Sequence, residues 1–201
     1  MNHTNQSGRS MIEMLGVLAI IGVLSVGGIA GYSKAMMKFK INKTIDQISQ
    51  IVANTRTLYA RQKNYGSLSG KVAYKANLAP KEMFENSGSG SYSLTHPFGG
   101  RVWFEAEDKS IAGDKKGFFI SLYDVPEEAC IELVTQDWGS DASSGLIAVS
   151  VNNGASRALL GCSGSSSGLA CSGGSIVSVP MPVDIAVDAC SNSEYISLKF
   201  Y

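Results

Sequence analysis

One carboxylate, Glu13, lies near the start of a segment that is otherwise apolar and continues to about Ala30. A charge at the mouth of a membrane segment is costly unless another group pairs with it, so such a residue is a candidate functional site by default. The five residues before it read Gly8-Arg9-Ser10-Met11-Ile12. The spacing from Gly8 to Glu13 indicates where a pairing group could come from.

The apolar segment is long enough to cross a membrane. Met14 to Ala30 is apolar or small apart from Ser25, and as a helix it approaches the ~20 residues that a bilayer core requires. An ordinary secretory signal has basic residues first and a cleavage site after its apolar run. Residues 1–8 contain no Lys or Arg, and the candidate cleavage site, Gly8, precedes the run. Cleavage there would retain the helix, whereas the simplest alternative is an uncleaved signal anchor.

The stretch from Gly8 to Leu24 resembles the class III signal of type IV pilins and related pseudopilins, because it combines the glycine, the spacing, the glutamate and the apolar run. The resemblance implies that a prepilin peptidase cleaves after Gly8 on the cytoplasmic face and that the new terminus, Arg9, is N-methylated. It also implies that Glu13 stands five residues into the mature chain. The chain departs from the family twice: its leader has only His3 in place of Lys or Arg, and Arg9 replaces the usual apolar first residue.

This resemblance gives Glu13 a role in assembly. If the apolar helices of several copies form a bundle, Glu13 lies in a low-dielectric environment, where an unpaired charge costs about 3 kcal/mol. Cleavage after Gly8 frees the α-amino group of Arg9, which can neutralise Glu13 of a neighbouring subunit and fix its register. Breaking one side of such a buried pair costs about 3–5 kcal/mol. Position alone equally allows Glu13 to reach the lipid head groups or to stabilise the helix start as an acidic first-turn residue.

After Tyr32 the pattern changes from wholly apolar to amphipathic. Apolar and small residues recur at alternating intervals of four and three: Ile41, Ile45, Ile48, Val52, Thr55 and Tyr59. This spacing is typical of a helix with one apolar face. We therefore predict one unbroken helix from near Met11 to about Gln62, roughly 75 Å long at 1.5 Å per residue. Its second half would pack onto a globular domain through that face.

The chain thus divides into a leader, an apolar half-helix, an amphipathic half-helix and a globular head, at residues 1–8, 9–33, 34–62 and 63–201. The head is predicted to be α+β, with the long helix across a single antiparallel sheet. Strand-like runs occupy residues 101–105, 117–122, 145–151 and 195–200. Short helices are predicted near residues 80–84 and over residues 124–135, where a proline fits the first turn. A His-Pro-Phe-Gly-Gly turn at residues 96–100 adds a resemblance to type IVb and thin-pilus pilins.

Four cysteines, Cys130, Cys162, Cys171 and Cys190, lie in the C-terminal half. An even count in a membrane-anchored chain fits an oxidising compartment and two disulfides, for which the sequence alone allows three pairings. Free buried thiols are the alternative. A metal site is disfavoured because no Cys-x-x-Cys pair exists and His96 is the only histidine outside the first eight residues. The pilin resemblance implies the pairs Cys130–Cys190, which brackets a C-terminal region, and Cys162–Cys171, within the Ser/Gly-rich segment between them.

The composition excludes some classes of function. The 17 Lys and Arg residues balance the 17 Asp and Glu residues, so the chain lacks the basic surface of a nucleic-acid binder. Asp137–Asp141 offers two carboxylates, fewer than the six to eight oxygens that calcium takes, and is predicted to be a plain turn. The sequence has no evident Ser/His/Asp arrangement, phosphate loop or metal cluster. We therefore expect neither enzymatic activity nor a cofactor.

These features together predict a structural subunit of a bacterial type IV pilus. We expect a single inner-membrane span with a periplasmic C-terminal domain before assembly, and an extracellular fibre afterwards. The positive-inside rule alone favours the opposite orientation, since Lys34, Lys38, Lys40 and Lys43 follow the span and only Arg9 precedes it. The cysteines and the resemblance outweigh that bias.

The expected partners are other copies of the chain, the prepilin peptidase, the inner-membrane assembly platform and the membrane. Two alternatives stay open at this point. One is a minor pilin or a type II secretion pseudopilin. The other is a membrane-anchored periplasmic binding module that never polymerises.

Overall fold

The computed structural model describes residues 11–62, 64–87, 91–106, 117–138, 145–152, 176–177, 180–191, 193 and 195–200. The chain divides into two compact units, residues 1–39 and residues 40–201. Helix α1 (Met11–Tyr59) is 49 residues long and belongs to both units. It ends three residues before the predicted boundary at Gln62. A turn follows, in which Gln62 N donates a hydrogen bond to Tyr59 O.

The first unit contains only the N-terminal part of α1. Every side chain from Met11 to Ala35 is exposed in this chain. The glycines of this part, Gly16, Gly22, Gly27, Gly28 and Gly31, have nothing from elsewhere in the chain within 4 Å of where a Cβ would stand. Contacts within the chain therefore explain neither the apolar side chains nor the glycines of this segment.

The second unit buries one face of α1. The buried side chains are Ile41, Thr44, Gln47, Ile48, Ile51, Val52, Thr55 and Tyr59. The predicted apolar face is confirmed except at Ile45, which is only partly buried. Because a helix has 3.6 residues per turn, the centre of the face continues from Ile41 through Thr44 and not through Ile45. The hydroxyls of Thr44 and Thr55 donate to backbone oxygens four residues earlier, at 2.8 and 2.6 Å.

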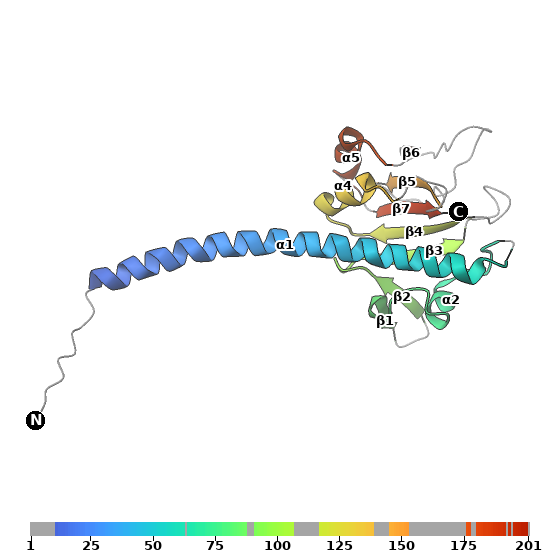
Figure 1. The fold of residues 1–201 in the computed structure, drawn as a ribbon, viewed down its shortest axis with the longest axis horizontal. Coiled ribbons are helices and arrows are strands. Elements are labelled where there is room, and N and C mark those ends of the chain that lie inside the picture. The colour runs from blue at the N-terminus through green and yellow to red at the C-terminus, as the bar shows by residue number, and fades with distance from the viewer. Residues whose placement is uncertain are drawn as a thin grey trace, which may run out of the picture. The chain divides into compact units, whose positions relative to one another are not determined.

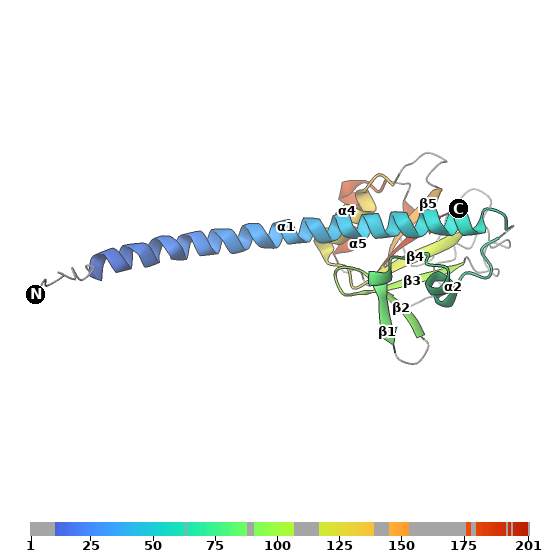
Figure 2. The ribbon, with the colours of Figure 1, turned by 60° about the horizontal axis from the view of Figure 1, so that its bottom comes forward.

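A seven-stranded antiparallel sheet forms the body of the second unit, in the order β1-β2-β3-β4-β7-β5-β6 (Figure 1). The strands are β1 (Phe84–Ser87), β2 (Ser91–Thr95), β3 (Arg101–Ala106), β4 (Phe118–Tyr123), β5 (Leu146–Asn152), β6 (Ile176–Val177) and β7 (Tyr195–Phe200). The last strand, β7, therefore lies between β4 and β5. The second half of α1 crosses this sheet in both views (Figure 2), as the predicted α+β arrangement requires.

An aromatic cluster connects the end of α1 to the middle of the sheet. Tyr59 contacts Tyr65 with ring centroids 5.2 Å apart, and Tyr65 contacts Phe118 of β4 at 4.9 Å. Phe118 also stacks on Phe200 of β7 at 5.5 Å. Phe118 is fully buried, and burial of an apolar side chain contributes about 1.5–3 kcal/mol. This cluster therefore holds α1 against the two central strands.

Among the described residues, four helical segments flank the sheet. They are α2 (Gly70–Lys75), the 3₁₀ turn η1 (Lys81–Met83), α4 (Glu127–Thr135) and α5 (Val183–Cys190). The predictions near residues 80–84 and over residues 124–135 correspond to η1 and α4, each preceded by a proline at its N-cap. The sequence did not lead us to predict α2 or α5. The four predicted strands correspond to β3, β4, β5 and β7, whereas β1, β2 and β6 were not predicted.

A disulfide joins the two helices at one end of the sheet. Cys130 of α4 bonds Cys190 of α5, with 5.9 Å between the Cα atoms and 60 residues between them in sequence. This is the pair expected from the sequence. A hydrogen bond from Met181 N to Val134 O, at 3.2 Å, also links the two segments. The other expected pair, Cys162 and Cys171, lies outside the described residues.

Replacing both cysteines of this disulfide, Cys130→Ala/Cys190→Ala, is expected to lower the free energy of unfolding by about 4 kcal/mol, because the bond closes a long loop in the unfolded chain. Denaturant unfolding monitored by circular dichroism measures the change. The matched control is Cys162→Ala/Cys171→Ala, for which the shorter loop predicts a smaller loss. An unchanged midpoint in the first variant would contradict the stabilising role of the Cys130–Cys190 bond.

Candidate assembly and binding sites

Glu13 lies in the first turn of α1 and is exposed there. An acidic residue at this place interacts favourably with the positive end of the helix dipole. Gly8 and Arg9 lie outside the described residues, so the structure does not place the expected cleavage site or the expected partner of Glu13. What the structure does give is the helix that positions Glu13 at the start of a long apolar surface.

No other part of the described chain covers that apolar surface. Its exposed large side chains are Met11, Ile12, Met14, Leu15, Val17, Leu18, Ile20, Ile21, Val23, Leu24, Val26, Ile29 and Tyr32. Soluble monomers rarely expose a contiguous apolar patch larger than a few hundred Å². By length and composition, α1 is the one described helix that could cross a membrane. We therefore treat residues 11–35 as a candidate surface for lipid and for other protein chains.

A polar cluster fixes α1 to the 3₁₀ turn η1. Lys43 forms an ion pair with Glu82 at 3.1 Å, and Gln47 Nε2 donates to the same carboxylate at 2.8 Å. The hydrogen bond from Gln47 and then the Lys43 ammonium group hold the pKa of the Glu82 carboxyl below its ordinary value. Glu82 is exposed, so this cluster orients η1 more than it stabilises the fold.

His96 shapes the turn between β2 and β3, as predicted, and is buried. Its Nδ1 accepts a hydrogen bond from the backbone N–H of Phe98 at 3.3 Å, so Nε2 carries the proton and donates to Tyr123 O at 2.7 Å. Burial lowers the pKa of His96, although its bond to the Tyr123 carbonyl and the nearby Asp124 carboxylate act in the opposite direction. A side chain at Gly100 would collide with Tyr123 O and with the His96 ring, so glycine is required there.

The described residues contain no group of three His, Cys, Asp or Glu side chains that could hold a metal ion. In the segment considered as a cation loop, Asp137 and Trp138 are described and residues 139–144 are not. Trp138 Nε1 donates to Leu133 O at 2.9 Å, which folds the chain back onto α4.

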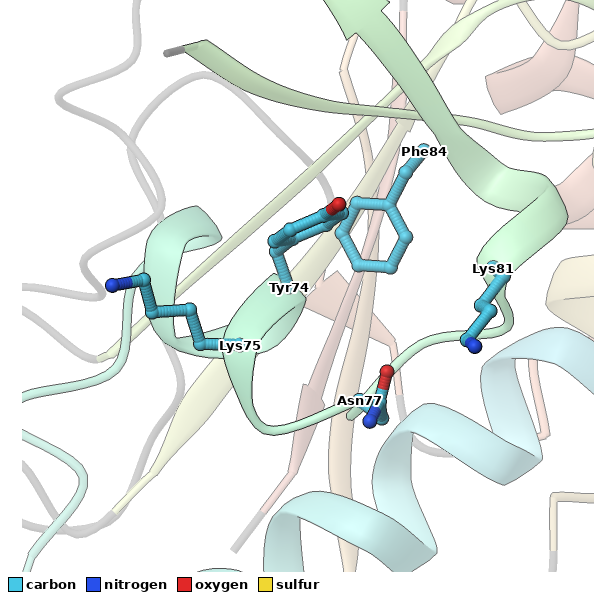
Figure 3. A pocket seen from close by; sticks show the side chains of 5 residues that line it. All are labelled: Tyr74, Lys75, Asn77, Lys81 and Phe84. Atoms are coloured by element: carbon cyan, nitrogen blue, oxygen red, sulfur yellow. The ribbon is translucent and has the colours of Figure 1, made fainter.

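A pocket on the head was not anticipated from the sequence. It has a volume of about 460 Å³ and is lined by Tyr74, Lys75, Asn77, Lys81 and Phe84 (Figure 3). These residues come from α2, the turn after it, η1 and β1. Their side chains meet only because the chain reverses direction after Lys75, and no spacing in the sequence indicates that reversal. Asn77, at φ +51°, is the one local signal, since Asn tolerates left-handed backbone at turns.

Comparison with known proteins gives a family and a fold. The family model described as "PilS N terminal" matches residues 28–179. Two bundle-forming pilus major structural subunits, from Escherichia coli O111:H- and from Escherichia coli O127:H6 (strain E2348/69 / EPEC), are 24% identical over 153 residues, which are 76% of this chain and 76% of each relative. A crystal structure of a type IV b pilin from Salmonella typhi has a TM-score of 0.51 at 17% identity, covering 79% of this chain and 97% of that one.

The buried, neutral His96 predicts a pH dependence of folding. Its pKa is lower in the folded head than in the unfolded chain, where it is about 6.5. The unfolded state therefore binds more protons between these two values, and the contribution of His96 to stability, present above pH ~6.5, is lost as the pH falls toward the folded pKa. Urea midpoints at pH 7.5 and 5.5 measure this loss.

The test variant is His96→Gln and the matched control is His3→Gln, both made in the uncleaved chain, which has only these two histidines. The difference in midpoint between the two pH values should shrink in His96→Gln and persist in His3→Gln. An equal pH difference in both variants would contradict the assignment.

Proposed function

Because this chain belongs to the PilS family of type IV pilins and is a structural subunit of a pilus, we propose that it is the major subunit of its fibre. Similarity to the major structural subunits of bundle-forming pilus from Escherichia coli supports this choice over a minor pilin or a secretion pseudopilin. We further propose that it resides in the inner membrane, with its head in the periplasm, before it joins an extracellular fibre. No catalytic activity forms part of this proposal.

The observation that carries the proposal is the exposed apolar half of α1. Between Met11 and Ala35 the chain covers none of its own apolar side chains. Transfer of each large apolar side chain out of water is favourable by about 1.5–3 kcal/mol of free energy. Lipid can cover this surface before assembly, because the segment is long enough to span the ~30 Å hydrocarbon core of a bilayer. The same segments of neighbouring copies can cover it in the fibre.

Close approach between such helices requires small residues, and the glycines of this segment fit that requirement. Gly22, Gly27 and Gly28 meet nothing in their own chain, yet each costs about 1 kcal/mol of helix propensity relative to alanine. A use outside the chain, as contact points for neighbouring helices, accounts for their presence.

The proposed role of Glu13 is to make the transfer from lipid to fibre selective. Prepilin peptidase would cleave after Gly8, and the α-amino group of Arg9 would become the cation that pairs with Glu13 of a neighbouring copy. An unpaired charge in the apolar interior costs about 3 kcal/mol or more. Only a subunit in the correct register would remove that cost, and the inner-membrane assembly platform would add subunits one at a time.

Removing the carboxylate should disrupt assembly. In Glu13→Ala, losing about 3–5 kcal/mol of pairing energy is expected to lower the amount of sheared surface fibre by roughly a hundredfold to a few thousandfold, while the level of subunit in the membrane stays unchanged. Quantitative immunoblotting of sheared and membrane fractions measures both. Asp46→Ala, which removes an exposed carboxylate from the same helix outside the apolar half, is the matched control and should assemble. Wild-type fibre yield in Glu13→Ala would contradict the proposed register role.

Leader removal is tested by intact-mass spectrometry of the protein in filaments. The expected mass corresponds to a chain that begins at Arg9, with or without one N-methyl group. A Gly8→Leu variant should retain residues 1–8 and stay in the membrane fraction. A wild-type chain that keeps its leader would support a simple signal anchor instead.

A further inference from the structure

The pocket beside α2 has the size of a small-molecule site. Its volume of about 460 Å³ lies within the range of about 300–1,000 Å³ that is usual for ligand pockets. It belongs entirely to the head and involves none of the apolar residues of the first half of α1. Two of its lining residues, Tyr74 and Phe84, form an aromatic wall, and the other lining residues form a polar wall (Figure 3).

The aromatic wall is held in place by contacts between rings. Tyr74 meets Phe84 edge to face, with centroids 5.0 Å apart, and it lies 4.8 Å from Tyr92 of the neighbouring strand. Although Tyr74 has two ring neighbours, 47% of its surface is still exposed. About half of the Tyr74 side chain therefore remains available to a ligand, and its orientation is already fixed by the contacts with Phe84 and Tyr92.

The polar wall is cationic and contains no carboxylate. Lys75 and Lys81 are exposed, and the structure gives neither of them an ion-pair partner among the described residues. The adjacent carboxylate, Glu82, is bound by Lys43 and Gln47 of α1, so it is not available to neutralise Lys81. In Figure 3 the side chain of Lys81 lies on the same side as Asn77, while that of Lys75 extends from the other side of Tyr74.

Asn77 completes the site with an amide group. Its backbone is in the left-handed region, at φ +51°, and is held there by hydrogen bonds from Asn77 N to Tyr74 O at 3.2 Å and from Leu78 N to Ala73 O at 2.9 Å. Asn54 Nδ2 of α1 also donates to Leu78 O at 3.0 Å. The turn is therefore fixed by backbone hydrogen bonds and by the side chain of Asn54, and the Asn77 side chain makes none of these bonds.

We propose that this pocket binds a sugar that carries a carboxylate. The exposed ring of Tyr74 would take the apolar C–H face of the sugar, Asn77 would bond a hydroxyl group, and Lys81 would bind the carboxylate, with Lys75 at the rim. A neutral sugar would leave both ammonium groups without a partner, and a small inorganic anion would leave the aromatic wall uncovered. This binding role is additional to the proposed fibre role and does not depend on polymerisation.

The test is saturation-transfer difference NMR on the full chain in detergent micelles, with sodium glucuronate as the probe and glucose as its neutral match. Glucuronate should bind at least about tenfold more tightly than glucose, and its ring C–H protons should receive the strongest saturation. Lys81→Gln should weaken glucuronate binding about tenfold, as expected for the loss of one charge-assisted hydrogen bond. Tyr74→Leu should also weaken it and remove the saturation pattern.

Lys71→Gln, on the same helix and outside the pocket lining, is the matched control and should bind as the wild type does. Circular dichroism checks that each variant is folded. Equal binding of glucose and glucuronate, equal loss in Lys71→Gln, or equally strong competition by acetate or inorganic phosphate would each overturn the proposal. So would the absence of saccharide binding together with a Lys81-dependent self-association, which would assign the pocket to a carboxylate of a second copy, such as the exposed Asp184 or Asp188.

Discussion

Among the described residues, no other part of the chain covers the apolar side chains in the first half of α1, and the rest of the structure depends on this constraint. Residues 11–35 expose every side chain, whereas the head builds a complete core from residues 40–200 without them. Burial of apolar surface is the main favourable term in protein association. Burying the exposed apolar side chains at this end of the chain would therefore be strongly favourable. Lipid can bury them first, and other copies of the same segment can bury them later.

The head holds the second half of α1 against a sheet whose strands all come later in the sequence. Its central strands, β4 and β7, are separated by 71 residues of sequence (124–194), yet they pair along their whole length. Phe118 and Phe200 join these strands, and Tyr65 joins them to the end of α1. The disulfide between α4 and α5 closes the intervening segment, so covalent chemistry limits the entropy of the long connection.

The features that the sequence predicted were those with strong local signals. The long helix, the strands β3, β4, β5 and β7, and the proline-led α4 each follow from a periodicity or a breaker within a few residues. The strands β1 and β2 were missed because they are short and rich in Ser, Glu and Asn, and their pairing is set by register with β3. The helix α5 was missed although, like α4, it follows a proline at its N-cap, Pro182. The pocket was missed for a different reason: Tyr74 and Phe84 are brought together by a reversal of the chain that depends on Asn54 of α1.

The central claim, that copies of the apolar half of α1 cover one another in the fibre, is tested most directly by cryo-electron microscopy of sheared filaments at side-chain resolution. The account predicts that residues 11–35 of neighbouring subunits pack together in the filament interior, with Glu13 of one copy within ion-pair distance of the N-terminal amino group of another. Filaments in which this segment faces solvent, or in which Glu13 has no cationic partner, would contradict it.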